Sequence, residues 1–300
     1  MGTGGCFAYL PQVGHLVLAM TYHDELTSII ERRPRIMIYH QLYFNPEKYQ
    51  TALVLLHAFP LDSRMWEPQI EKLVDENIPF LAMDYPGFGR SSLLTKEPSM
   101  DDFADEVYQV IKRLNLQKVV VLGLSMGGYV ALSLYRNHPD IFSGLILADT
   151  RATADSEEGR QRRFKLIEEI RNDPSMKRLI QMHLEKFYTP ETRVSRPELP
   201  TLAESLMKGA KPQGVIHALQ AMASRQDSTN LLGHMSFPVL VIAGEKDSLT
   251  SVEDAQAMKD PFQQGRLEII PNAAHLTNVE KPQEFNKILL RYLSDFGLGR

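Results

Sequence analysis

One stretch, residues 118–132, constrains the fold more than any other part of the sequence. An unbroken apolar run, Val119–Leu122, leads into Ser125, and a helix-compatible segment follows. The apolar run predicts a central parallel strand that is buried on both faces. Gly123 and Gly127 flank the serine, where a sharp turn from strand to helix would crowd any Cβ. The stretch therefore predicts an α/β protein in which the Ser125 hydroxyl stands above the carboxyl edge of a parallel sheet.

The spacing Gly-x-Ser-x-Gly between a strand and a helix is the pattern of a nucleophile elbow. Such a turn exposes the Ser125 hydroxyl and points the backbone N–H of Met126 at the same place. A glycine-rich turn that carries a solvated serine is the alternative interpretation. A phosphate-binding loop is disfavoured because no Gly-Lys-Ser or Gly-Lys-Thr follows the glycines.

Composition and charge narrow the classes of function. With 43% hydrophobic and 23% charged residues, the 300-residue chain resembles an ordinary globular protein that can bury a large core. A formal net charge of −4 argues against binding to nucleic acid or an anionic membrane surface, and no apolar run approaches the ~20 residues of a membrane-spanning helix. The single cysteine, Cys6, and the lack of a basic segment before the apolar run Leu16–Met20 predict a reducing, cytoplasmic setting.

Strand and helix patterns alternate along most of the chain, which predicts a mostly parallel sheet with helices on both faces. Apolar runs predict strands over residues 36–44, 52–56, 79–83, 119–122, 144–149, 237–244 and 266–270. The alternation stops after Asp149 and resumes near residue 236. Between them the patterns are helical only, over residues 157–170, 176–187, 201–208 and 214–223.

We therefore predict three parts. Residues 36–150 and 236–300 form an α/β core, and residues 151–235 form an inserted all-helical cap over the edge of the sheet. Residues 1–35 form an N-terminal arm, which contains either a short helix over residues 24–32 or a loose segment.

Two further residues are placed to activate Ser125. A serine is a weak nucleophile unless a base takes its proton, and the base works best when a third group orients it. Asp247 lies in the loop that leaves the strand ending near residue 244, and His275 follows the last strand. Because the carboxyl ends of parallel strands meet at one edge of a sheet, we expect Ser125, Asp247 and His275 to meet there.

Each of these residues also has a plainer interpretation. Asp247 alone would be a turn carboxylate or a helix cap, and His275 a surface histidine beside a helix. Asp149, which also ends a strand, is the rival acid. Five other histidines follow no late strand, so we expect cap or loop roles for them: His57, His138, His183, His217 and His234.

Hydrolysis through a serine also needs backbone N–H donors for the developing oxyanion. Met126 supplies one from the turn. Phe59, in the loop after the early strand that ends at residue 56, supplies the other. For His57 we expect a structural role beneath that loop.

These motifs together resemble those of the α/β-hydrolase superfamily over about residues 36–296. They are most similar to small-substrate carboxylesterases, enol-lactonases and haloperoxidase-like members that use no cofactor. Those families show His-Gly-x-Pro, Asp-x-x-Gly-x-Gly-x-Ser, Gly-x-Ser-x-Gly-Gly, Gly-x-x-Asp and Gly-His. The matching segments here are 57–60, 84–91, 123–128, 244–247 and 274–275. Ala58 and Ala274 replace family glycines, and alanine would be strained if either position required a positive φ.

The resemblance implies a serine hydrolase of carboxylic esters of small or medium apolar acids, with no cofactor or metal. In this interpretation Ser125 attacks the acyl carbon, His275 shuttles the proton and Asp247 orients the imidazole. Two alternatives stay open. One is hydrolysis of a lactone, or of a C–C bond beside a ketone, by the same residues. The other is a ligand-binding receptor without catalysis on the same scaffold. The oligomeric state is not predicted.

Side chains of the cap should set the substrate. Several are adaptable and apolar, and they either line an acyl pocket or simply pack the cap on the sheet: Met176, Met182, Leu184, Phe187, Tyr188, Met207 and Met222. Arg151 leaves the strand at Asp149 and either meets a substrate carboxylate or lies in solvent. A cation in the pocket would favour an acidic lactone over a neutral ester.

Overall fold

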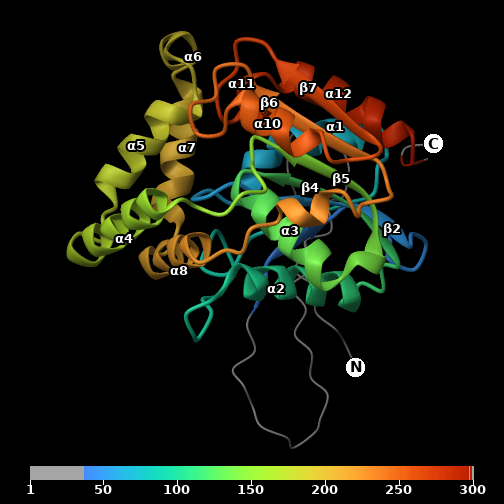
Figure 1. Cartoon of the computed structure of the whole chain (residues 1–300), viewed down its shortest axis with the longest axis horizontal. Helices are drawn as coiled ribbons and strands as arrows, with labels where there is room; N and C mark the ends of the chain where they lie inside the picture. Colours follow the sequence, from blue (N-terminus) through green and yellow to red (C-terminus); the bar gives the residue numbers. More distant parts are fainter. Residues whose placement is uncertain (1–36, 297, 299–300) are drawn as a thin grey trace, which may run out of the picture.

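A seven-stranded sheet lies at the centre of the computed structural model, which describes residues 37–296 and 298 (Figure 1). The strand order is β1-β3-β2-β4-β5-β6-β7. The strands are β1 (His40–Leu42), β2 (Thr51–Leu56), β3 (Phe80–Met83), β4 (Lys118–Leu124), β5 (Phe142–Ala148), β6 (Val239–Gly244) and β7 (Gly265–Ile270). Every neighbouring pair is parallel except β1 and β3. The prediction of a mostly parallel sheet is confirmed.

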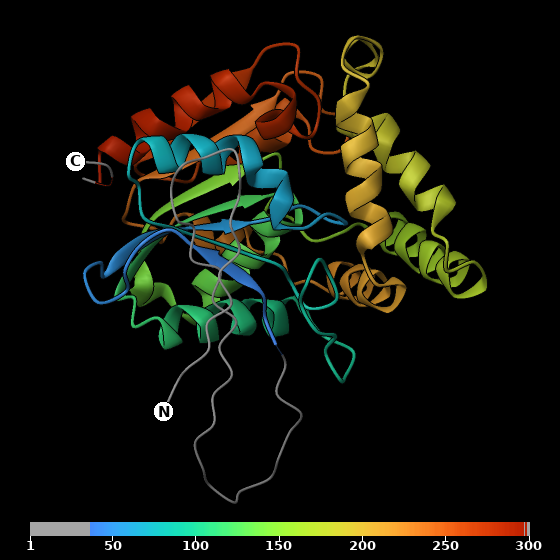
Figure 2. The ribbon, with the colours of Figure 1, turned by 180° about the vertical axis from the view of Figure 1, so that it is seen from behind.

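Helices cover both faces of the sheet, as predicted (Figures 1 and 2). On one face, α1 (Glu67–Asp75) lies beside α12 (Pro282–Ser294). On the other face, α2 (Met100–Arg113) packs on α3 (Met126–Asn137). The shorter elements of the core are the 3₁₀ turns η1 (Ser63–Trp66) and η2 (Pro139–Ile141) and the helices α10 (Val252–Lys259) and α11 (Thr277–Glu280).

The middle of the sheet is β4, the apolar run that the sequence predicts to be buried on both faces. Only Lys118, at its start, is exposed. Val121 has Val54 of β2 on one side and Leu145 of β5 on the other. A strand with this composition needs neighbours and helices all around it, because it has no polar face to turn to water.

The residues between β5 and β6 form a helical insertion. Its helices are α4 (Glu157–Asn172), α5 (Lys177–Phe187), α6 (Pro190–Ser195), α7 (Glu198–Gly209), α8 (Pro212–Ala223) and α9 (Thr229–Leu232). All of residues 151–235 are described, and none lies in a strand. Helices α4 to α8 lie together beside the sheet, on the left of Figure 1 and on the right of Figure 2.

Prolines explain why several helix bounds differ from those expected. Pro190 and Pro212 begin α6 and α8, so α8 starts before the expected range 214–223. Proline fits the first turn of a helix because the N–H that it lacks has no partner there. The unexpected helices α6, α9 and α11 are too short to show a helical period in the sequence.

The expected first strand over residues 36–44 is longer than the strand that forms. Only His40–Leu42 pairs, and its single neighbour is β3, a strand of four residues. Among the described residues β1 is an edge strand of the sheet, so no second neighbouring strand extends its pairing. The expected arm over residues 1–35, with Cys6 and the segment 24–32, lies outside the described residues.

The turn from β4 to α3 brings three backbone segments unusually close. Ser125 has φ 56° and ψ −115°, which is a strained conformation for a residue with a side chain. A Cβ on Gly127 would lie 2.1 Å from the carbonyl oxygen of Leu56, and a Cβ on Gly123 would lie 2.3 Å from the carbonyl oxygen of Gly127. Only glycine permits this approach, so the predicted sharp turn is present.

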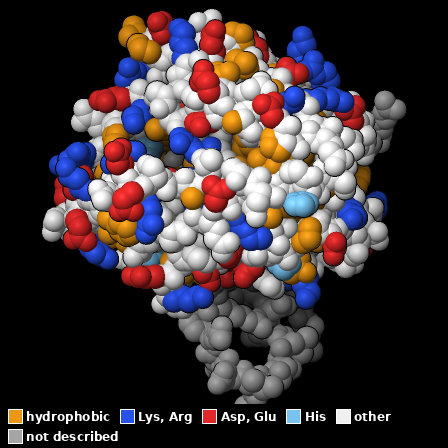
Figure 3. Space-filling view, viewed as in Figure 1, with side chains coloured by type: hydrophobic (Ala, Val, Ile, Leu, Met, Phe, Trp, Pro, Cys, Tyr) orange, Lys and Arg blue, Asp and Glu red, His pale blue; other side chains and the backbone are white. Residues whose placement is uncertain are grey.

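The face of the molecule in Figure 3 carries Lys and Arg side chains interspersed with Asp and Glu. The sequence has 33 Lys and Arg and 37 Asp and Glu residues, so positive and negative side chains are nearly equal in number and the formal net charge is only −4. Within the part of the chain that the structure describes, no helix is both long enough and apolar enough to cross a membrane.

We expect Gly127→Ala to lower the free energy of unfolding by about 1–3 kcal/mol, because the extra carbon must push β2 away from the turn. Gly159→Ala is the matched control. A Cβ at Gly159 would meet its nearest neighbour at 3.4 Å, and alanine is favoured over glycine in a helix by about 1 kcal/mol. Urea denaturation of the two variants measures both changes. A Gly127→Ala protein as stable as the wild type would contradict the close approach.

Candidate active site

The carboxyl ends of β4, β6 and β7 bring together the three residues predicted to form a catalytic group. The hydroxyl Oγ of Ser125 lies 2.8 Å from Nε2 of His275. The other ring nitrogen of His275, Nδ1, lies 2.8 Å from Oδ2 of Asp247. These contacts join a serine, a histidine and a carboxylate in one chain of hydrogen bonds, the arrangement in which an imidazole can take a proton from a serine.

Short local hydrogen bonds hold Asp247 in place. Its Oδ1 accepts the backbone N–H groups of Leu249 at 2.7 Å and Thr250 at 3.2 Å, and its Oδ2 accepts the Thr250 hydroxyl at 2.6 Å. Burial alone would raise the pKa of Asp247, but the charge and hydrogen bond of His275 outweigh it and lower the pKa. Asp247 is therefore an ionised carboxylate directed at the imidazole.

His275 is buried and oriented from several sides. Burial alone would lower its pKa, but the charge and hydrogen bond of Asp247 outweigh burial and raise it. The ring of Phe187 in the insertion lies nearly parallel to the imidazole, with the two centroids 6.1 Å apart. The next residue, Leu276, donates its N–H to the Phe187 carbonyl at 3.1 Å. The insertion thus helps to position the loop that carries His275.

Asp149, the rival acid, has a different set of partners. Its Oδ1 accepts the N–H of Gly244 at 2.9 Å, and its Oδ2 accepts the hydroxyl of Thr277. Burial, together with the negative charge of Asp247, raises the pKa of Asp149 to about 8. Nδ1 of His275 faces Asp247 and not Asp149. Asp149 instead connects the chain after β5 to Gly244 at the end of β6 and to Thr277 near His275.

The two residues predicted to hold an oxyanion, Phe59 and Met126, both belong to segments near Ser125. Met126 begins α3, and the first N–H groups of a helix have no partner within it. Phe59 lines the cavity beside Ser125. The N–H groups of these residues remain our candidates for oxyanion donors.

His57 forms hydrogen bonds that connect the loop carrying Phe59 to Tyr85. Nδ1 of this buried histidine lies 2.9 Å from the carbonyl oxygen of Ala58, and its Nε2 accepts the N–H of Tyr85 at 3.0 Å. Burial lowers the pKa of His57, so the ring is neutral. Neither Ala58 nor Ala274 is among the described residues that have a positive φ, so alanine causes no strain at these positions.

A cavity of about 110 Å³ opens beside Ser125 between the sheet and the insertion. It is lined by Phe59, Ser125, Tyr129, Arg151, Arg163, His183, Phe187, Met222, Leu249, Thr250 and His275. Among the described residues, no group of three or more His, Cys, Asp or Glu side chains is arranged to hold a metal ion.

Only part of the expected pocket lining takes this position. Of the seven apolar cap residues, Phe187 and Met222 line the cavity, whereas Met207 is buried in the insertion and Met176 lines a separate hollow. Most of that set therefore follows the alternative interpretation, which is packing. Arg151 lines the cavity, which is the position expected if it meets a substrate carboxylate.

Other residues that line the cavity were not predicted from the sequence. Tyr129 and Arg163 had no motif to mark them. His183 was expected to have a cap role, and it also faces the cavity. Burial lowers the pKa of His183 to about 4, so it is neutral near pH 7. Thr250 alone had a usable signal, because it lies three residues after a predicted turn carboxylate.

Comparison with known proteins identifies the family of the chain. Residues 51–282 match the family model described as the alpha/beta hydrolase fold, which covers more than half of the chain. The chain belongs to the α/β-hydrolase fold family. The earlier resemblance is thereby confirmed at the level of the family.

Several relatives within the α/β-hydrolase fold family are hydrolases of esters or lactones. A thermophilic esterase from Thermogutta terrifontis, solved with malate bound, is 32% identical, with a TM-score of 0.82 over 87% of this chain and 94% of that one. The esterase from Exiguobacterium antarcticum is 26% identical, with a TM-score of 0.75 over 86% and 96%. The 3-oxoadipate enol-lactonase 2 of Acinetobacter baylyi is 29% identical over 236 residues, which are 78% of this chain and 85% of that protein.

Replacing Asp149 by asparagine should change how stability depends on pH. The folded-state pKa of about 8 lies above the ~3.9 of an unfolded aspartate, so at intermediate pH the folded protein binds a proton that the unfolded chain lacks. Stability therefore falls as pH rises between these values, by up to about 1.4 kcal/mol per pH unit from this group. An asparagine side chain does not titrate, and its amide oxygen can still accept the Gly244 N–H, so Asp149→Asn should remove this slope.

Urea unfolding at pH values between about 5 and 8 measures the slope for both proteins. Asp75→Asn, at an exposed position, is the control and should keep the slope of the wild type. A difference in stability between the wild type and Asp149→Asn that stays constant over this range would show that Asp149 is not protonated in the folded state.

Proposed function

We propose that this protein is a serine hydrolase that cleaves carboxylic esters of small or medium acids through an acyl-enzyme. The observation that carries the proposal is the hydrogen-bonded chain from Ser125 through His275 to Asp247, which opens on a cavity. Esterases among its relatives support it.

Acylation follows from the roles of these groups. Nε2 of His275 accepts the proton of Ser125 as the hydroxyl oxygen attacks the ester carbonyl carbon. The ionised Asp247 stabilises the imidazolium that forms. The N–H groups of Phe59 and Met126 hydrogen-bond to the negative oxygen of the tetrahedral intermediate. His275 then gives the proton to the alcohol oxygen, which leaves.

Deacylation repeats the sequence with water. His275 takes a proton from a water molecule that attacks the acyl carbon, and it returns the proton to Ser125 as the acid departs. No other reactant is needed. We propose that residues 151–235 act as a cap that closes the acyl side of the site through Phe187 and Met222.

Lactone hydrolysis is the second candidate function. The enol-lactonase relative favours it, and the same residues would open a lactone ring, with the alcohol remaining attached to the product. The two candidates differ in substrate and not in mechanism, so substrate profiling separates them.

The test is the rate of hydrolysis of p-nitrophenyl esters of increasing acyl length and of small lactones, for the wild type and Ser125→Ala. We expect turnover by the wild type and a loss of about 10⁴- to 10⁶-fold in kcat for the variant, because the covalent route is removed. Ser133→Ala is the control, since Ser133 lies on α3 behind the turn and pairs with Asp101. Equal activity of the wild type and Ser125→Ala would contradict the proposal. Tight binding of the same molecules without any turnover would favour the receptor.

A further inference from the structure

The cavity beside Ser125 has positive charge on its wall and no negative charge to match. Arg151 and Arg163 both line it, and none of the described lining residues is Asp or Glu. His183 is neutral near pH 7 and adds no charge. Both arginine side chains are partly buried, with 33% of Arg151 and 21% of Arg163 exposed, and leaving the donors of a partly buried cation unpaired is costly. A cavity with this lining has more hydrogen-bond donors than acceptors.

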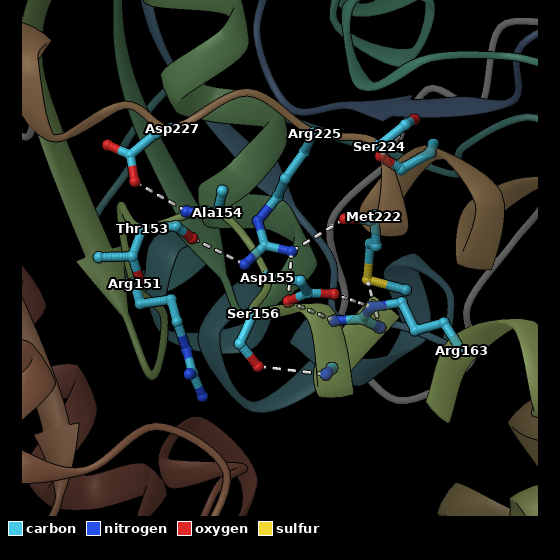
Figure 4. Close-up of polar contacts among 12 residues, drawn as sticks. Arg151, Thr153, Ala154, Asp155, Ser156, Arg163, Met222, Ser224, Arg225 and Asp227 are labelled. Carbon is cyan, nitrogen blue, oxygen red and sulfur yellow. Dashed lines mark hydrogen bonds and ion pairs between the residues drawn. The ribbon is translucent and has the colours of Figure 1, made fainter. Parts of the chain in front are cut away.

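Two of the three guanidinium nitrogens of Arg163 contact a carboxylate, and the third does not. Nε and Nη2 contact the carboxylate of Asp155, with the Nη2 contact at 3.4 Å. Nη1 donates only to the thioether sulfur of Met222 at 3.3 Å, which is a weak acceptor. Figure 4 shows the guanidinium lying between Asp155 and the sulfur of Met222. Nη1 of Arg163, a charged donor, therefore lacks an oxygen partner.

The single negative charge near Arg163 is shared. Nη1 of Arg225 lies 2.6 Å from the same Asp155 carboxylate, so two guanidinium groups share one carboxylate and the group of three carries a net charge of +1. Arg225 is well satisfied, because it also donates to the carbonyl oxygens of Met222 and Thr153. Arg225 does not line the cavity beside Ser125. Arg225 also has the negative charge of Asp227 nearby, because the charge of Arg225 helps to lower the pKa of that carboxyl group. Among the described residues, Arg163 pairs with no carboxylate other than the shared Asp155.

Arg151 supplies a second incompletely paired cation. Its Nη2 donates to the carbonyl oxygen of Leu249, and the nearest carboxylate, Asp254, lies 3.9 Å away, beyond hydrogen-bond distance. Its Nε is buried and has no hydrogen-bond partner. In Figure 4, Arg151 lies apart from the cluster formed by Asp155, Arg163 and Arg225. Arg151 and Arg163 thus both line the space next to the nucleophile, and each has a guanidinium nitrogen without an oxygen partner.

We propose that Arg163, with Arg151, binds a carboxylate of the substrate, and that the preferred substrates are half-esters of short dicarboxylic acids or lactones that carry a free carboxylate. This inference rests on the proposed hydrolase function and names its substrate class. A carboxylate is the partner that fits, since its two oxygens can accept charge-assisted hydrogen bonds from the unpaired guanidinium nitrogens of Arg163 and Arg151. Hydrolysis of a half-ester with one water then yields an alcohol, a dicarboxylate and one proton.

The experiment compares pairs of methyl esters that differ only in charge. Each half-methyl ester of succinic, glutaric and adipic acid is measured beside the ester in which a carboxamide replaces the free carboxylate, with released acid titrated at constant pH. For the best chain length, we expect kcat/KM of the wild type to be about ten- to a hundredfold higher for the half-ester, because the amide has no charge to pair. Equal values for the two members of every pair would overturn the proposal.

Variants assign the preference to residues. Arg163→Gln should lower kcat/KM for the half-ester by about ten- to a hundredfold and change the value for the amide less than about threefold. Arg163→Lys keeps the charge without the planar fork and should lose less. Arg162→Gln removes the same charge from the outer side of α4, where the side chain is 72% exposed, and should change neither value. A charge preference that survives both Arg163→Gln and Arg151→Gln would also overturn the proposal.

Binding separates a failure of this inference from a failure of the proposed function. Calorimetric titration of Ser125→Ala with glutarate and with its half-amide needs no turnover. Tighter binding of glutarate that is lost in the double variant Ser125→Ala/Arg163→Gln supports the subsite even if no ester is hydrolysed. Hydrolysis of neutral esters without any preference for glutarate would leave the hydrolase standing and remove the subsite. Thermal unfolding of each variant shows whether the fold is intact.

Discussion

The site depends on the close approach of the turn after β4 to the end of β2. With Gly127 pressed against the carbonyl of Leu56, the chain reverses within a few residues, and Ser125 is held in a strained backbone conformation. Two hydrogen bonds secure it from the other side: the N–H of Ser125 reaches the carbonyl of Ala148 at 2.9 Å, and the Thr150 hydroxyl reaches the Ser125 carbonyl at 2.8 Å. The hydroxyl of Ser125 is left pointing at His275.

Two buried carboxylates near one imidazole are kept in different states by their surroundings. Asp247 has a protonatable partner in His275 and local N–H donors, which lower its pKa, whereas Asp149 has burial and a like charge, which raise its pKa to about 8. Like charges this close favour one ionised and one protonated group. Asp247 can then orient His275 while Asp149 ties the loops together without adding a second negative charge. This division of roles follows from environment, since the two side chains are chemically identical.

The sequence allowed the core of the site to be predicted because each of its residues follows a strand. The apolar runs before Ser125, Asp247 and His275 mark strand ends, and parallel strands place those ends at one edge. The lining supplied by the insertion could not be predicted in the same way. Helix α4 carries Arg160, Arg162 and Arg163 in sequence, and helical spacing does not say which of them meets α8 and Asp155. That choice is made by packing between segments far apart in the sequence.

Labelling with a fluorophosphonate tests the central claim most directly, because this reagent forms a stable bond only with a serine whose hydroxyl is activated. We expect one phosphonyl group per chain, located by peptide mass mapping on Ser125. Labelling of Asp247→Asn should be much slower, because His275 loses the carboxylate that orients it. Labelling at another serine, or none under conditions where the protein is folded, would contradict the assignment of Ser125, His275 and Asp247 as a working nucleophilic group.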